Sequence, residues 1–239
     1  MTDQDKDGKN KAPGGIAIEE TFNVIENQDT EALLRSHQKE LADLADSAPE
    51  LERYNIRLDI TSAQLALEKK TEAWNEARAC FDFFVAHSEW QKAVEACDVM
   101  FQCESDDSII ALANGLWLAV TFPINPGTTI AMLQHVIDET PDNSDGAAVA
   151  AITAHYIADI RAEGEKSESL KFLATQMIAA VAKRHSQVDD QEMLEFWIER
   201  MELKDPAIFL PKLAKVLDII ANDQWWYDRD QLRKQIPDN

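Results

Sequence analysis

Residues 81–107, FDFFVAHSEWQKAVEACDVMFQCESDD, decide the fold because their apolar residues recur at the spacing of an α-helix. The apolar positions after Ser88 are Trp90, Ala93, Val94, Cys97, Met100 and Phe101. Glu95, Asp98 and Gln102 fall on the opposite side of the same helix. Intervals of three and four residues place one stripe of a helix against a core and leave the other side in water. The pattern therefore predicts an amphipathic helix over 89–104.

The same periodicity extends in both directions along the 239-residue chain. It predicts helices at 16–26, 30–46, 49–70, 72–87, 89–104, 108–121, 128–139, 145–163, 167–185, 189–203, 206–221 and 226–236. Only seven glycines and eight prolines occur, and no hairpin dipeptides separate alternating apolar residues, so we expect almost no strand. Short connections force neighbouring helices into antiparallel pairs. The sequence predicts an all-α fold: serial helical hairpins in a short right-handed α-solenoid of eleven or twelve helices.

The predicted organisation has four parts, beginning with a disordered tail at 1–15 that is rich in Asp, Lys, Asn and Gly. The others are N-terminal helices at 16–70, helical hairpins at 71–185 and C-terminal capping helices at 186–239. Three helix starts carry capping signals. These signals are Ser88 with Gln91, Asp205 followed by Pro206, and Asp228 with Gln231.

Negative charge is concentrated in the middle of the chain. Residues 71–160 hold fourteen acidic residues against two basic ones, Arg78 and Lys92, and so carry −12 of the total charge of −21. A field of this sign favours cationic partners and opposes binding to nucleic acid or to anionic membranes. The alternative is an ordinary hydrated face that aids solubility. The sequence leaves open whether these carboxylates line a groove or only cover a hydrated face.

Other classes of function find little support in the residues. The most apolar stretch, 109–122, is shorter than the roughly twenty residues of a membrane span. Cys80, Cys97 and Cys103 lack zinc-site spacing, and their odd number without a signal peptide favours a reducing cytoplasm. His135 and Glu139, one helical turn apart, are expected to form an exposed ion pair, unless His135 is a partly buried core histidine. No catalytic, metal-binding or cofactor motif occurs, so we assign no such residue.

Residues 81–107 resemble a tetratricopeptide repeat. An aromatic residue, Phe84, lies late in the first helix, and Ser88 occupies the turn. Trp90, Ala93 and large apolar residues follow on the second helix, where the small Ala93 permits close helix approach. A second copy begins about 36 residues later, with Pro126, Thr129, Leu133, Val136, Ile137 and Pro141 in the places of Trp90, Ala93, Cys97, Met100, Phe101 and Ser105. The resemblance implies a concave surface that binds an extended peptide or a partner helix, without catalytic activity.

Three adjacent rings, Trp225, Trp226 and Tyr227, stand near the C-terminus. Three consecutive side chains cannot all face one core from one helix. One hypothesis makes them a cap that seals the end of the solenoid, and the other makes Trp225 and Trp226 a contact for a partner.

The sequence favours a non-enzymatic, cytoplasmic adaptor that binds a basic peptide or protein through an acidic helical surface. The expected contacts are Glu89, Glu95, Asp98, Glu104, Asp106, Asp107, Asp138, Glu139 and Asp142, together with Trp225 and Trp226. The alternative is an assembly or maturation chaperone dedicated to one client subunit or its basic targeting peptide. A third hypothesis, an enzyme on a helical bundle, requires a polar pocket with a perturbed ionisable group. The partner, the pathway and the oligomeric state are not encoded in these patterns.

Overall fold

The computed structural model describes residues 14–164 and 166–236, which form eleven α-helices and no strand. The predicted all-α fold of serial helices is thereby confirmed for these residues. The predicted tail at 1–15 lies outside the described residues, apart from Gly14 and Gly15, which begin the first helix.

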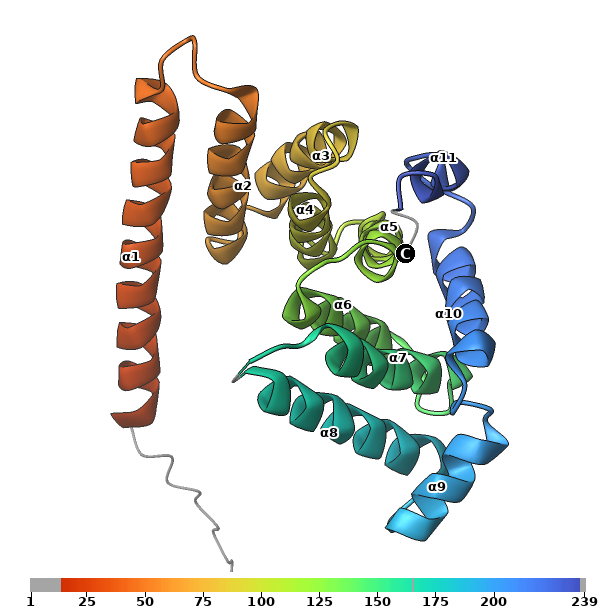
Figure 1. The fold of residues 1–239 in the computed structure, drawn as a ribbon. Helices are drawn as coiled ribbons and strands as arrows, with labels where there is room; N and C mark the ends of the chain where they lie inside the picture. The colour runs from red at the N-terminus through yellow and green to blue at the C-terminus, as the bar shows by residue number, and fades with distance from the viewer. Residues whose placement is uncertain (1–13, 165, 237–239) are drawn as a thin grey trace, which may run out of the picture.

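The helices follow one another with short connections (Figure 1). They are α1 (Gly14–Asp43), α2 (Glu50–Ala66), α3 (Lys70–Ala86), α4 (Trp90–Gln102), α5 (Ser108–Thr121), α6 (Pro126–Glu139), α7 (Asp145–Arg161), α8 (Lys166–Ser186), α9 (Gln191–Arg200), α10 (Pro206–Ala221) and α11 (Arg229–Arg233). The prediction of two helices at 16–26 and 30–46 is wrong, because α1 runs through both. No glycine or proline interrupts 16–43, and the polar residues at 27–30 do not by themselves end a helix.

Each helix from α1 to α8 packs against the next one in the sequence, as serial hairpins require. Figure 1 shows this series running from α1 and α2 on one side of the molecule to α8 at the bottom. The C-terminal part departs from the series. Helix α10 packs on α5 and α7 instead of extending the array, so it covers one face of helices that precede it by many residues.

The core lies mainly between α3 and α7. Phe81, Phe84, Met100, Leu112 and Leu116 are fully buried there. Helices α4 and α5 pack closely at Gly115. A Cβ atom placed on Gly115 would lie only 2.4 Å from Cys97 Cβ, so the missing side chain of Gly115 permits this packing.

Two of the three predicted helix starts are confirmed. The carboxylate of Asp205 accepts from the Ala207 N–H (2.9 Å), and that of Asp228 accepts from the Asp230 and Gln231 N–H groups (2.9 and 3.0 Å).

The prediction that Ser88 caps α4 is wrong. Its backbone is left-handed (φ 59°) and ends α3, while the next N–H, that of Glu89, donates to the Phe84 carbonyl oxygen (2.9 Å). This geometry closes the C-terminus of a helix, and the very short turn leaves no room for a separate cap on α4.

In the part of the chain that the structure describes, no helix combines the length and apolar character needed to cross a membrane.

Candidate functional site: an acidic groove on α2, α4 and α6

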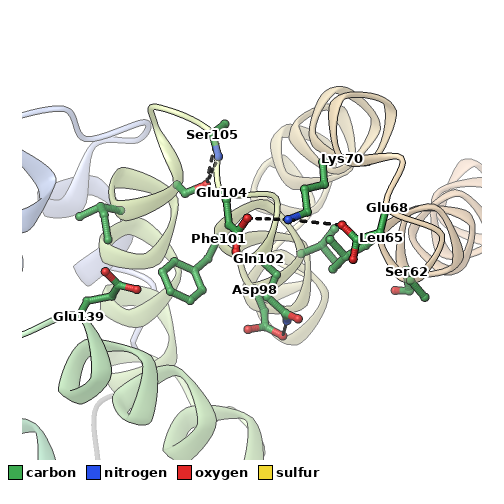
Figure 2. A pocket seen from close by; sticks show the side chains of 14 residues that line it. Ser62, Leu65, Glu68, Lys70, Asp98, Phe101, Gln102, Glu104, Ser105 and Glu139 are labelled. Atoms are coloured by element: carbon green, nitrogen blue, oxygen red, sulfur yellow. Dashed lines mark hydrogen bonds and ion pairs between the residues drawn. The ribbon is translucent and has the colours of Figure 1, made fainter. Parts of the chain in front are cut away.

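A wide hollow lies where α2, α4 and the end of α6 come together (Figure 2). Its volume is about 850 Å³. A second hollow of about 350 Å³ lies between the same three helices and shares Ser62, Asp98 and Val99 with the first. We call the two hollows together the acidic groove.

Carboxylates dominate the charged lining of the acidic groove. They are Asp59, Glu68, Glu95, Asp98, Glu104 and Glu139, and the lining contains one cationic side chain, Lys70. The amphipathic pattern of α4 explains part of this placement. Its apolar stripe packs inward, and the opposite stripe, with Glu95, Asp98 and Gln102, turns toward the groove.

Lys70 joins two of the carboxylates across the mouth of the larger hollow. Its Nζ lies 2.6 Å from Glu104 Oε2 and 3.5 Å from Glu68 Oε2, as the dashed lines in Figure 2 show. The hydrogen bond with Glu104 raises the pKa of Lys70, and the same bond lowers the pKa of Glu104. The positive charge of Lys70 therefore already pairs with Glu104 and Glu68.

The remaining groove carboxylates differ in how they are paired. Glu95 meets Lys92 (2.9 Å), and Asp98 Oδ1 lies 2.9 Å from His135 Nε2. His135 thus pairs with Asp98 of α4, and the expected exposed pair with Glu139 is not formed. The side-chain carboxylates of Glu139 and Asp59 make no ion pair or hydrogen bond with other described residues, and both residues are exposed to a ligand.

An aromatic side chain forms part of the groove wall. Figure 2 shows the ring of Phe101 pointing into the larger hollow between Glu139 and Asp98. The ring of His135 lies next to it, with a centroid distance of 4.6 Å. A ring face beside carboxylates suits a cationic side chain, because the ring quadrupole and the carboxylates both attract positive charge.

Contacts between positions 34 or 37 residues apart recur along the groove helices. The Asn125 N–H donates to Gln91 Oε1 (2.9 Å), and Gln91 Nε2 donates to Thr128 Oγ1 (3.0 Å). The contact of Lys70 with Glu104 spans 34 residues, and that of Asp98 with His135 spans 37. Such constant separations arise when successive helical pairs stack in the same register, which is compatible with a helical repeat solenoid.

The predicted contact carboxylates fall into two groups. Glu95, Asp98, Glu104 and Glu139 line the acidic groove. The others lie in turns or on outward positions that do not line it, and they are Glu89, Asp106, Asp107, Asp138 and Asp142. Sequence reasoning missed Asp59 and Glu68, which α2 and the turn after it bring to the groove. Their signal was weak because both precede the acidic stretch at 71–160.

Trp225 and Trp226 lie away from the acidic groove. Both are half-buried, and Trp226 packs on Phe81 of α3 with a centroid distance of 5.3 Å. Tyr227 lies beside Trp117 of α5 (5.4 Å). The segment therefore folds back over α3 and α5.

The three cysteines are buried free thiols. Burial raises the pKa of Cys80 to about 12 and that of Cys97 well above its usual value. Thiols with raised pKa values are poor nucleophiles near neutral pH. Within the described residues no group of three or more His, Cys, Asp or Glu side chains is arranged to hold a metal ion.

Comparison of the chain with protein-family models, with curated proteins and with solved structures found no match in any of the three. Functional inference therefore depends on the geometry of the chain itself.

Proposed function

We propose that the protein is a non-enzymatic interaction adaptor that binds a basic peptide or a basic protein segment in the acidic groove. The observation that supports this most is the lining of the groove, which holds six carboxylates and one lysine, Lys70, with Lys92 paired to Glu95 beside it. Like charges gathered along one groove repel one another, and a cationic ligand relieves the repulsion. The resemblance to tetratricopeptide repeats supports the same class, because such arrays bind peptides and not small-molecule substrates.

The shape of the groove favours an extended ligand over a compact one. It runs past three helices, and its two hollows are joined at Ser62, Asp98 and Val99. Glu139 and Phe101 offer one position for a cationic side chain, and Asp59 offers another in the smaller hollow. A chain with several lysines or arginines places charge at both positions, whereas a single small cation occupies only one.

The test uses fluorescence anisotropy of a labelled peptide rich in arginine and lysine with the full-length protein. One variant combines Asp98→Asn, Glu104→Gln and Glu139→Gln, all in the groove. The matched control combines Asp106→Asn, Asp138→Asn and Asp142→Asn, which change the net charge by the same amount outside the groove. We expect the groove variant to bind about tenfold more weakly than the control, equivalent to about 1.4 kcal/mol.

Binding to the native protein should also weaken as the ionic strength rises from about 0.05 M to about 0.3 M, because salt screens the attraction between exposed charges. Equal losses of affinity in the two variants would show that overall charge, and not the groove, attracts the peptide. Binding that does not respond to salt would also contradict the proposal.

A further inference from the structure

The last described residues, 224–236, leave the helical array and lie over its α3 and α5 helices. We call them the C-terminal strap. The strap follows α10 through Asn222 and Asp223, two consecutive residues with left-handed backbone (φ 48° and 58°). Figure 1 shows α11 beside α5, on the opposite side of the array from α1 and α2. The strap therefore occupies a different face from the acidic groove.

One buried side chain holds the strap by hydrogen bonds. Asn114 of α5 is 0% exposed, and its Nδ2 donates to the Gln224 carbonyl oxygen (3.1 Å). Its Oδ1 accepts from the Trp226 N–H (3.0 Å), and its own carbonyl oxygen accepts from the Tyr227 hydroxyl (2.6 Å). Proteins commonly hold a peptide segment by hydrogen bonds from a buried side-chain amide to two backbone groups of that segment.

Ring contacts complete the hold on the strap. Trp226 meets Phe81 edge to face at 74°, and the guanidinium carbon of Arg78 lies 4.2 Å from the centre of the Trp226 ring. Tyr227 lies beside Trp117. Aromatic pairs and cation–π contacts of this kind depend on ring orientation and so fix the positions of Trp226 and Tyr227.

The strap adds one side chain to the central core and packs three half-buried rings, those of Trp225, Trp226 and Tyr227, against its edge. Among residues 224–236 only Leu232 is a buried hydrophobic residue, and α11 has just five residues. The Trp225 indole Nε1 is buried without a hydrogen-bond partner in the described chain.

Two exposed polar contacts add to the hold on the strap: Arg229 pairs with Asp218 of α10 (2.7 Å), and the Ser88 hydroxyl donates to Gln235 Oε1 (3.2 Å). A segment held mainly by side-chain contacts at the surface, and attached through a left-handed junction, has the character of a docked ligand more than of a core element.

We propose that the surface formed by Phe81, Asn114 and Trp117 is a docking site for peptide segments with adjacent aromatic residues, and that the strap is its resident, exchangeable occupant. The partner that fits is a neutral aromatic segment of the same chemistry as Trp226 and Tyr227. Release of the strap uncovers this site. The inference stands independently of the acidic groove.

The test uses the full-length Trp226→Ala variant, which weakens the strap and leaves the docking surface intact. The probe is a fluorescein-labelled peptide of residues 222–236, NDQWWYDRDQLRKQI, whose three aspartates balance its three basic residues. We expect saturable binding to the variant and binding at least about tenfold weaker to the native protein, in which the tethered strap competes. A peptide with Trp226→Ala, and the double variant Asn114→Ala/Trp226→Ala, should each abolish binding.

Hydrogen exchange on the same proteins monitors the strap directly. In Trp226→Ala, amides of 224–236 should exchange faster while those of α3 to α7 keep their protection. A strap that opens without binding the peptide overturns the proposal. So does a strap that stays protected, or loss of protection throughout the body, because the strap is then an integral part of the fold. The milder Tyr227→Phe variant should also speed exchange of the strap amides, by a smaller factor than Trp226→Ala. If Trp226→Ala unfolds and Tyr227→Phe leaves strap exchange unchanged, the proposal is overturned.

Discussion

The two faces of the helical array differ in the forces that act on them. The acidic groove on α2, α4 and α6 is lined by six carboxylates and one lysine. The face on α3 and α5 is covered by the C-terminal strap through rings and the amide of Asn114. We expect binding at the first face to depend on long-range charge and on salt, and closure of the second face to depend on short-range packing and on the ionisation of a phenol. Net charge alone therefore points to only one of the two surfaces.

The largest effect is expected at Gly115, which lies between the two faces. Adding a Cβ atom by Gly115→Ala forces it against Cys97 Cβ at 2.4 Å and Met132 Cε at 2.7 Å. We expect the free energy of unfolding to fall by about 2 kcal/mol, because overpacking costs more than the gain in helix propensity. Urea unfolding followed by circular dichroism measures this change. Both faces should lose ligand binding together if α5 is their common support.

The control is Gly127→Ala, in the first turn of α6. There the nearest atom to an added Cβ is Asn125 Oδ1 at 3.1 Å, which accepts from the Gly127 N–H (2.8 Å) and has to shift by only a few tenths of an ångström. The expected change is within about 0.5 kcal/mol. Equal destabilisation by the two substitutions would show that α4 and α5 do not need the close contact at Gly115.

Local patterns in the sequence were sufficient to predict the array of helices. The spacing around Trp90 and Ala93 gave α4 within a few residues, and Asp205 with Pro206 gave the start of α10. The errors were at Ser88, which does not cap α4, and at 27–30, where polar residues do not end α1. A cap depends on the backbone angle that the neighbouring helix imposes, and this angle has no signature in residue type alone.

The candidate site was predictable only in part. Charge counting found Asp98, Glu104 and Glu139, which the structure places in the acidic groove. It also selected Asp106 and Asp142, which do not line it, because charge counting gives no direction for a side chain in a turn. The partner of Trp226 is more than a hundred residues away, at Asn114. No local pattern encodes a contact at that separation.

The second effect concerns alkaline pH and separates the strap from the groove. Burial raises the pKa of Tyr227 well above its usual value, and Cys97 reinforces the rise while Arg229 opposes it. An acid whose pKa is higher in the folded state than in the unfolded state stabilises the fold fully at pH values below the unfolded pKa. The contribution of Tyr227 is therefore complete below about pH 10 and is lost as the pH rises toward the folded pKa, by up to about 1.4 kcal/mol per pH unit.

Unfolding free energies of the native protein and of Tyr227→Phe, measured between about pH 8 and about pH 11, check this prediction. Cys80 and Cys97 also have raised pKa values and weaken both proteins above about pH 9, so the difference between the two curves isolates the phenol. The stability advantage of the native protein should shrink as the pH rises. A constant difference would mean that Tyr227 ionises without disturbing the strap.

The smallest effect is expected at the junction of the strap. Asp223→Gly removes a side chain from a left-handed position (φ 58°), and relief of that strain outweighs the extra freedom of glycine in the unfolded chain by about 0.5 kcal/mol. The strap should close more firmly, so its amides should exchange more slowly. Gln187→Gly, at φ 56° after α8, provides the same local relief far from the strap along the chain and should leave strap exchange unchanged. Faster strap exchange in Asp223→Gly would mean that the aspartate stiffens the junction. A rigid connection to α10 would then stabilise the contacts of Trp226 and Tyr227 by more than the backbone strain at Asp223 destabilises them.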